Sequence, residues 1–225
     1  MRIIIPLLLL ILSFKSYSQS NQTYRIIENY EVNRSTGKIN NIDYSEVLGS
    51  PYWNENFSPS ILFLNDDQQV TKIKLRYNIF TDDFEIKQRG KIFNIKKDKN
   101  LKKIQINDVF FSLIEIDKFQ KNTIAEILYD NKLKLFLKHQ AYFLKAELAK
   151  GYTEPKPNRF EIPNPKLYLK TPFNRSLIRI KKIKDFAKIF PRSSSKIKKF
   201  IKENKIKIDN KEQLIQLVRY IEEIA

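Results

Sequence analysis

An alternation of apolar and polar side chains with a period of two constrains this chain more than any other feature. It is clearest over residues 72–79, where Ile73, Leu75, Tyr77 and Ile79 alternate with lysine, arginine and asparagine. Successive side chains of a strand point to opposite sides of a sheet, so this period is that of a strand with one buried face. The pattern therefore predicts a strand whose apolar side lies on a core.

Similar short segments recur through the middle of the chain, separated by turns rich in Asn and Asp. The turn at residues 81–83 is followed by a second alternating segment at 84–87, which predicts a hairpin. Further strands are predicted at residues 60–64, 91–95, 101–106, 109–116, 123–129 and 133–137, and residues 137–148, which fit neither period cleanly, are also assigned as strand. Tight polar turns favour antiparallel neighbours, because parallel strands need crossovers of about a dozen residues or more. We therefore expect an antiparallel meander, a sandwich or a partly closed barrel.

The pattern changes twice towards the C-terminus. Prolines concentrate in residues 151–172, which we interpret as a loop that ends the β domain. Beyond it, residues 175–225 carry apolar side chains at helical spacing, which predicts three short basic helices with N-caps at residues 193–195 and at Asn210. The expected class is α+β, with a β domain over residues 19–170. The helices are expected to pack on that domain, because so short a segment buries little surface alone.

The N-terminus has the organisation of a secretory signal peptide. A cationic start at Arg2 leads into the apolar run 3–12, and small residues follow at Ser16 and Ser18. A bilayer span needs about 20 apolar residues, and this run is shorter and is ended by Lys15. We predict that residues 1–18 are removed after Ser18, which leaves a periplasmic or secreted protein without a transmembrane span.

Composition restricts the chemistry that the chain can perform. It contains no Cys, which excludes disulfides, thiolate nucleophiles and thiolate metal sites. The formal net charge is +17, from 42 Lys and Arg against 25 Asp and Glu, and such an excess suits an anionic partner. Lysine predominates over arginine, whereas recognition of phosphates and base edges favours arginine, and export makes a genomic target implausible. We therefore expect an anionic surface as a possible partner and no nucleic acid.

Three short motifs carry a resemblance to known sequences. They are GSPY at residues 49–52, LRYNIF with DFE at 75–80 and 83–85, and KKFIKEN at 198–204. Together they resemble an uncharacterised family of small exported proteins from Bacteroidota-type bacteria, whose signal peptides are often followed by Gln, here Gln19. The resemblance implies a location in the cell envelope and carries no activity.

The residues that usually mark catalysis are sparse. His139 is the only histidine and has no thiolate partner for a metal site, so we interpret it as a hydrogen-bonded residue in or beside the core. No Gly-x-Ser-x-Gly, Gly-x-Gly-x-x-Gly or Walker pattern occurs. The acidic pairs Asp66-Asp67 and Asp82-Asp83 are interpreted as turn residues. No catalytic, metal-binding or cofactor-binding residue is predicted.

Two segments are candidates for binding a partner. The loop 49–59 contains Tyr52, Trp53 and Phe57, rigid aromatic residues that suit contact with a sugar ring or a protein, although we favour the alternative that they cover one end of the β core. The second segment is the lysine-rich C-terminus, where exposed cations would attract anionic surface material. Its candidate residues are Lys181, Lys182, Lys198, Lys199 and Lys202.

Taken together, these features predict an exported, non-catalytic binding or scaffold protein of the bacterial cell envelope that contacts a protein or glycan. One alternative is a hydrolase of envelope polymers that uses two acids brought together on one sheet face. Its candidates are Glu85, Glu115, Asp117 and Glu126. A second alternative is a carrier that encloses an apolar ligand in a closed barrel, against which a core filled with Phe and Ile would argue.

Overall fold

The computed structural model describes residues 27–31, 44–65, 67–117, 119–120, 122–149 and 154–225. The predicted signal peptide, its cleavage site and Asp66 lie outside the described residues. The described strands are β1 (Ile27–Glu31), β2 (Ser58–Leu64), β3 (Gln69–Asn78), β4 (Asp83–Gln88), β5 (Lys91–Ile95), β6 (Leu101–Ile106), β7 (Val109–Ile114), β8 (Thr123–Asp130), β9 (Lys134–Lys138), β10 (Tyr142–Leu144), β11 (Arg159–Glu161), β12 (Lys166–Lys170) and β13 (Ile178–Ile180). The helices are α2 (Asp185–Ile189), α3 (Ser194–Glu203) and α4 (Lys211–Ile224), with short 3-10 turns at Tyr44–Glu46 and Pro191–Ser193.

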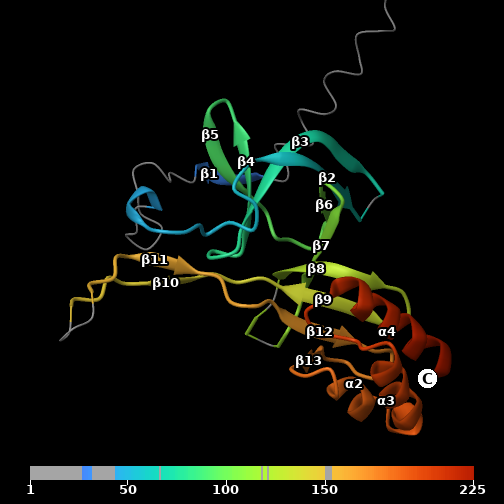
Figure 1. The fold of residues 1–225 in the computed structure, drawn as a ribbon. Coiled ribbons are helices and arrows are strands. Elements are labelled where there is room, and N and C mark those ends of the chain that lie inside the picture. The colour runs from blue at the N-terminus through green and yellow to red at the C-terminus, as the bar shows by residue number, and fades with distance from the viewer. Residues whose placement is uncertain (1–26, 32–43, 66, 118, 121, 150–153) are drawn as a thin grey trace, which may run out of the picture.

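Eleven of these strands form one antiparallel sheet, and the predicted α+β class is confirmed (Figure 1). The strand order is β1-β5-β4-β3-β2-β6-β7-β8-β9-β12-β13, and the sheet does not close on itself within the described part of the chain. Strands β10 and β11 pair separately and form an arm that extends to one side of the body. Of the three architectures that the sequence allowed, the structure shows the antiparallel meander.

The predicted strands are found, and the hairpin between β3 and β4 is confirmed by the pairing of Asn78 with Asp83. The segments predicted at residues 91–95 and 101–106 have the same bounds in the structure. Strand β3 begins earlier than predicted because a bulge at Lys72, where φ is +58°, shifts the pairing with β2. The bulge reverses the alternation and turns Val70 into the core.

The proline-rich segment differs from the loop expected at residues 151–172, because it contains β11 and β12. Pro163 and Pro165 precede β12 and Pro172 follows it, so they lie outside the ladder, where a strand needs no amide donor. Strand β12 is internal to the sheet, between β9 and β13. The ambiguous segment 137–148 is divided, because β9 ends within it and β10 begins after a short extended link.

Strands β1 to β7, called the first half of the sheet here, curl around a core of their own. The hydroxyl oxygen of Tyr77 on β3 lies 3.3 Å from the carbonyl oxygen of Ile124 on β8, although three strands separate β3 from β8 in the sheet. The amide of Ala141 likewise donates to the carbonyl of Ile79 at 3.2 Å. The side chains enclosed here include the fully buried rings of Tyr77, Phe84 and Phe111 and many isoleucines. A core filled with Phe and Ile in this way argues against the carrier alternative.

Strands β8, β9, β12 and β13 form the second half of the sheet, and helices cover one of its faces. Leu135 and Leu137 of β9 and Leu167 and Leu169 of β12 pack with α2, α3 and α4 in one apolar cluster. From α4 this cluster receives residues at helical spacing, which are Leu214, Leu217, Val218 and Ile221. The helices therefore lie on the sheet and share its core.

The two predicted helix caps have different outcomes. The Asn210 side chain accepts the amide of Gln213 at 2.9 Å and caps α4 as predicted. Ser193 precedes α3, but its side chain makes no capping bond and instead donates to the carbonyl of Ile224 at 3.0 Å. The reason is that α3 continues directly from a 3-10 turn, and the Ser193 hydroxyl is directed to the end of α4.

Candidate binding pocket on the open face of the sheet

The face of β9 and β12 that lies opposite the helices is called the open face here. On β9 the side chain of Phe136 points to this face, between the two leucines that enter the helix-covered core. Its cross-strand partner on β12 is Tyr168, and the two neighbouring rungs pair Lys134 with Lys170 and Lys138 with Lys166. Two lysine rungs therefore flank one aromatic rung.

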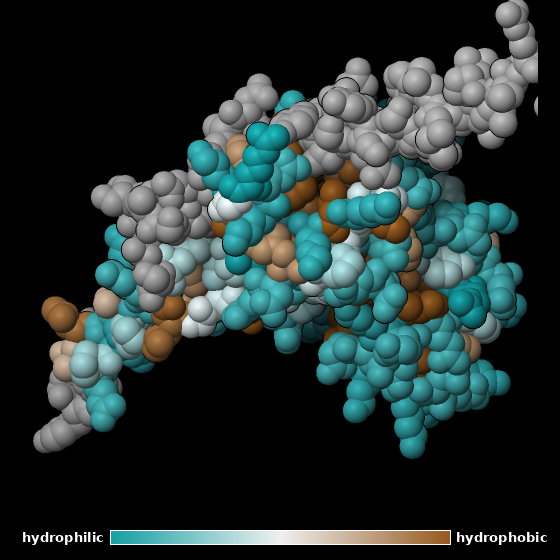
Figure 2. All heavy atoms as spheres, turned by 90° about the horizontal axis from the view of Figure 1, so that it is seen from above, coloured by the Kyte–Doolittle hydropathy of each residue, from teal (hydrophilic) through white to brown (hydrophobic). Residues whose placement is uncertain are grey.

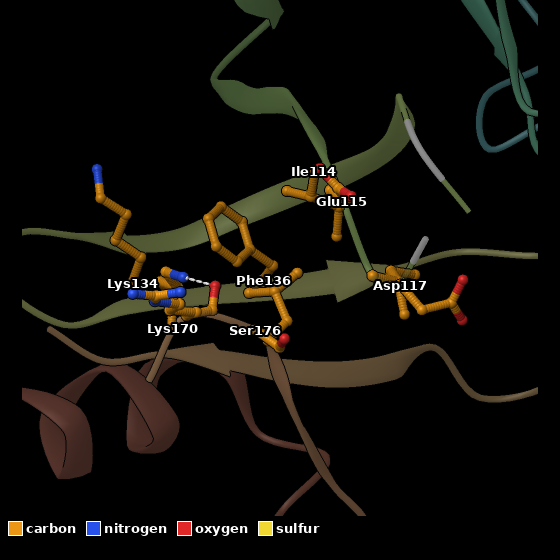
Figure 3. A pocket seen from close by; sticks show the side chains of 10 residues that line it. Ile114, Glu115, Asp117, Lys134, Phe136, Lys170 and Ser176 are labelled. Carbon is orange, nitrogen blue, oxygen red and sulfur yellow. Dashed lines mark hydrogen bonds between the residues drawn. The ribbon is translucent and has the colours of Figure 1, made fainter. Parts of the chain in front are cut away.

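A pocket of about 810 Å³ opens over the aromatic rung (Figure 3). Its floor consists of Ile114 at the end of β7, Phe136 on β9 and Leu177 in the loop before β13. Ile114 and Phe136 are buried, at 7% and 6% exposure, so the floor is apolar and closely packed. The volume lies within the range of small-molecule sites, about 300–1,000 Å³.

The rim of this pocket separates charges of opposite sign. Lys134 and Lys170 lie at one end, and Glu115 and Asp117 lie at the other, with Phe136 between them (Figure 3). Arg175 belongs to the cationic end, because its carbonyl accepts a hydrogen bond from the Lys170 ammonium. The pocket is thus dipolar along its length.

Neighbouring groups hold the rim side chains in place. The Lys134 ammonium contacts Asp130 at 2.5 Å, and Lys103 contacts the other oxygen of Asp130 at 3.2 Å. The hydrogen bond from Lys134 is the main reason that the pKa of Asp130 lies below its usual value. At the other end, one oxygen of Asp117 accepts the amides of Phe119 and Gln120 at 2.8 and 2.9 Å, which fixes the carboxylate at the rim.

A smaller polar pocket of about 220 Å³ follows along the same face. It shares Ile116 with the larger pocket and contains Lys138 and Lys166 of the next rung. Lys138 is buried, forms an ion pair with Asp82 and donates to the hydroxyl of Tyr77 at 3.0 Å. Burial is the main cause that lowers the pKa of Lys138, and burial likewise raises that of Tyr77. The charge of Lys138 is thus balanced by Asp82, and the Tyr77 hydroxyl bonds to both. We therefore interpret the polar side chains of the smaller pocket as structural, because they connect β3, β8 and β9.

Asp82 lies in the predicted turn, but its carboxylate binds groups outside that turn. One oxygen accepts the Tyr77 hydroxyl at 2.7 Å, and the other accepts the amide of Ile124 at 3.2 Å. The local turn is instead closed by Asn78, whose side-chain oxygen accepts the amides of Phe80 and Thr81 at 3.1 Å. Asp82 therefore connects the hairpin to the second half of the sheet.

His139 lies beside the core, as predicted, and belongs to a polar cluster on the helix-covered side. Its Nε2 lies 2.7 Å from one oxygen of the buried Glu126, whose other oxygen accepts a hydrogen bond from Lys211 of α4. Burial raises the pKa of Glu126, but the hydrogen bonds from His139 and Lys211 outweigh it, so the pKa lies below the usual value. The cluster ties the sheet to the last helix.

The aromatic residues Tyr52, Trp53 and Phe57, predicted to contact a partner, pack against other side chains of this protein. The Arg76 guanidinium lies over the rings of Tyr52 and Phe57, at 3.7 and 4.6 Å from their centroids. Trp53 is partly buried and packs edge-on against Phe111 with centroids 5.2 Å apart. The loop thus covers the first core, which is the structural role that the sequence also allowed, and a contact with a partner stays a prediction.

The predicted lysines lie at the helical end of the molecule, away from the pocket rim. Lys198, Lys199 and Lys202 are exposed on α3, where helical spacing places them on one side. Lys181 and Lys182 are exposed before α2, and their backbone amides donate to Asp185 at 3.1 and 2.9 Å. Figure 2 shows hydrophilic side chains over most of the visible face, with apolar ones in scattered patches and on the arm.

Of the four acids considered for hydrolysis, the structure brings only Glu115 and Asp117 to one pocket. Glu85 is buried in the first half, paired with Arg76 at 2.7 Å, and Glu126 lies on the helix-covered side. Glu115 and Asp117 are both exposed at a rim, whereas a glycosidase acid needs an apolar enclosure. The geometry therefore favours binding over hydrolysis.

Sequence reasoning missed the cationic rungs and Phe136, although a signal was present. The segments KLFLK (134–138) and KLYLK (166–170) repeat the same order of lysine, aromatic residue and lysine at alternate positions. Alternate positions share one face of a strand, so each segment carries a cation, ring, cation pattern on that face. Their antiparallel pairing aligns the two patterns.

Comparison with protein-family models, with curated proteins and with solved structures finds no match to this chain. Among the described residues, no helix is both long and apolar enough to cross a membrane. In the same part of the chain, no group of three or more His, Asp or Glu side chains is arranged to hold a metal ion.

Proposed function

We propose that this protein is an exported, non-catalytic binding or scaffold component of the bacterial cell envelope, and that the pocket over Phe136 contacts its protein or glycan partner. Export is inferred from the signal-peptide pattern of residues 1–18. The exposed lysines of α3 would add salt-sensitive attraction to anionic surface material.

One observation carries this proposal. The pocket combines an apolar floor with a few charged side chains at its rim, and binding sites are usually apolar with a small number of polar groups. Its acids are exposed and lie opposite three cations. Recognition without bond breaking is what this arrangement supports best.

Site-specific crosslinking in cells tests the proposal. The photoreactive residue p-benzoylphenylalanine is placed at Ser176 on the pocket rim, at Ser195 on α3, or at Asp108 in the β6–β7 turn as a control. All three positions are exposed or half-exposed, so each variant should fold. We expect a reproducible crosslinked species from Ser176 that is absent from Asp108, and mass spectrometry of this species identifies the partner.

Fractionation of the same cells tests the location. When the full-length sequence is expressed, the protein should be recovered with envelope or extracellular material. It should be shorter than the translated chain, because residues 1–18 are removed. If the chain stays in the cytosol, or if Ser176 gives only the adducts seen from Asp108, the proposed function is wrong.

A further inference from the structure

We propose that the dipolar pocket binds a short peptide with free termini, its carboxylate at the Lys134, Lys170 and Arg175 end and its ammonium at the Glu115 and Asp117 end. This inference rests on the proposed function and narrows the partner to one chemical class. It begins from the separation of charge along the pocket (Figure 3).

The opposed charges of the rim select against ligands of a single sign. A polyanion would meet Glu115 and Asp117 after passing the lysines, and a polycation would meet Lys134 and Lys170. Like charges placed across an interface cost binding energy and reject such partners. A molecule with one anionic and one cationic end is complementary to both ends of the pocket.

The cationic end is suited to a carboxylate. Arg175 is exposed, and its guanidinium makes no ion pair with any described acid, so its forked donors remain for a ligand. Lys134 is held near the rim by Asp130, and Lys170 by the carbonyl of Arg175. The end of the pocket is therefore positioned before a ligand arrives, which reduces the entropy lost on binding.

The floor argues for a peptide and against a stacked sugar. Phe136 is 6% exposed, so little of its ring is available to stack against a pyranose ring. What remains open to the pocket is a closely packed apolar surface with Ser176 beside it. Small aliphatic side chains and backbone amides suit such a surface.

The spacing of the rungs limits the length of the peptide. The pocket extends from the rung of Lys134 and Lys170 towards the rung of Lys138 and Lys166, where the smaller pocket begins. Four residues of strand separate these rungs, which is about 13 Å. An extended chain covers about 3.3–3.6 Å per residue, so two to four residues fit between the charged ends.

Calorimetric titration of the purified chain with trialanine tests this assignment. The comparison ligands are N-acetyl-trialanine, which lacks the ammonium, trialanine amide, which lacks the carboxylate, and an oligomer of galacturonic acid. We expect trialanine to bind and each blocked form to bind at least tenfold more weakly.

Two substitutions locate the peptide ends. Arg175→Gln should weaken trialanine at least tenfold but should change the affinity for trialanine amide little, because the amide has no carboxylate to lose. Asp117→Asn keeps the acceptor for the two turn amides and should weaken trialanine far more than N-acetyl-trialanine. Arg192→Gln and Asp108→Asn, both exposed and outside the pocket, are the matched controls and should bind as the wild type does.

The outcomes separate this inference from the proposed function. If trialanine does not bind, or if either blocked form binds as trialanine does, the peptide assignment is wrong. Preferential binding of the galacturonic acid oligomer would replace the peptide with a glycan. A Ser176 crosslink to an envelope partner in that case leaves the proposed function standing. If the chain binds the peptide but never leaves the cytosol, the peptide assignment stands and the proposed function is wrong.

Discussion

The two halves of the long sheet bury their apolar faces in different ways. The first half curls until β3 touches β8, and its core contains the rings of Tyr77, Phe84 and Phe111, with neighbouring centroids 5.0 to 5.6 Å apart. The second half is covered on one face by α2, α3 and α4 and has a mainly aliphatic core. A sheet that folds on itself uses up its inner face, whereas a sheet covered by helices can present its other face to a ligand.

The aromatic core of the first half should be the most sensitive part of the molecule. Phe111→Ala removes a fully buried ring that contacts Trp53, Tyr77 and Phe84, and we expect it to lower the free energy of unfolding by about 4 kcal/mol. Urea denaturation measures the change. Phe110 is the matched control, because it is the preceding residue on the same strand and is 37% exposed. Equal costs for Phe110→Ala and Phe111→Ala would contradict the enclosed core.

The contact between helices and sheet should be nearly as sensitive. Leu217→Ala empties a fully buried position between α4 and the second half of the sheet, which should lower the free energy of unfolding by about 3 kcal/mol. The neighbouring Gln216 is exposed, and Gln216→Ala should cost less than about 0.5 kcal/mol. A single unfolding transition for all four variants would show that the two halves unfold together, and separate transitions would sharpen their distinction.

The polar tie between sheet and α4 should make stability depend on pH. The pKa of Glu126 is lowered in the folded protein, so the carboxylate stabilises the fold fully above its unfolded pKa of about 4.3 and loses this contribution as the pH falls through the folded value. Glu126→Gln should lower the free energy of unfolding by about 2 kcal/mol at neutral pH, since charged hydrogen bonds are lost. The wild type and the variant should converge at low pH, and denaturation curves at several pH values check this. A constant difference at all pH values would contradict the role of the charge.

The smallest effect on stability is expected at the outer side of α3. Replacing Lys198, Lys199 and Lys202 together by Gln should change the free energy of unfolding by less than about 0.5 kcal/mol, because all three are exposed. The same variant should lose envelope association at low salt, where the attraction of surface cations is least screened. Cosedimentation with cell envelopes over a salt series measures this. Unchanged association and salt dependence would remove the electrostatic part of the proposed function.

Much of the secondary structure was predictable because it is encoded over a few residues. The alternation in β3 and β4, the turn between them and the Asn210 cap each depend on neighbours in the sequence. Strand β12 was missed because the surrounding prolines dominated the local signal, although its five residues alternate. Ser193 stands at the start of α3 as predicted, but its side chain makes no capping bond and donates to the carbonyl of Ile224 instead, which no local pattern shows.

The candidate site was predictable only in fragments. The similarity of KLFLK and KLYLK is visible in the sequence. The two segments form lysine and aromatic rungs only because β9 pairs with β12, and β10 and β11 lie between these strands in the chain. The acidic end comes from the segment after β7, and nothing local shows that it lies over Phe136. The aromatic loop covers the first core through Trp53, because burial of a large ring stabilises the fold, and its contact with a partner stays a prediction.

The sequence by itself determined strands β2 to β9, the three C-terminal helices, the excess of positive charge and the absence of thiol chemistry. These properties follow from residue types and their spacing over short distances. Only the tertiary structure decided which strands are neighbours, that the first half curls around its own core, and that cations and acids face each other over Phe136. Each of those depends on apolar surfaces far apart in the chain finding one arrangement that buries them together, and the charged side chains are carried to their places by that packing.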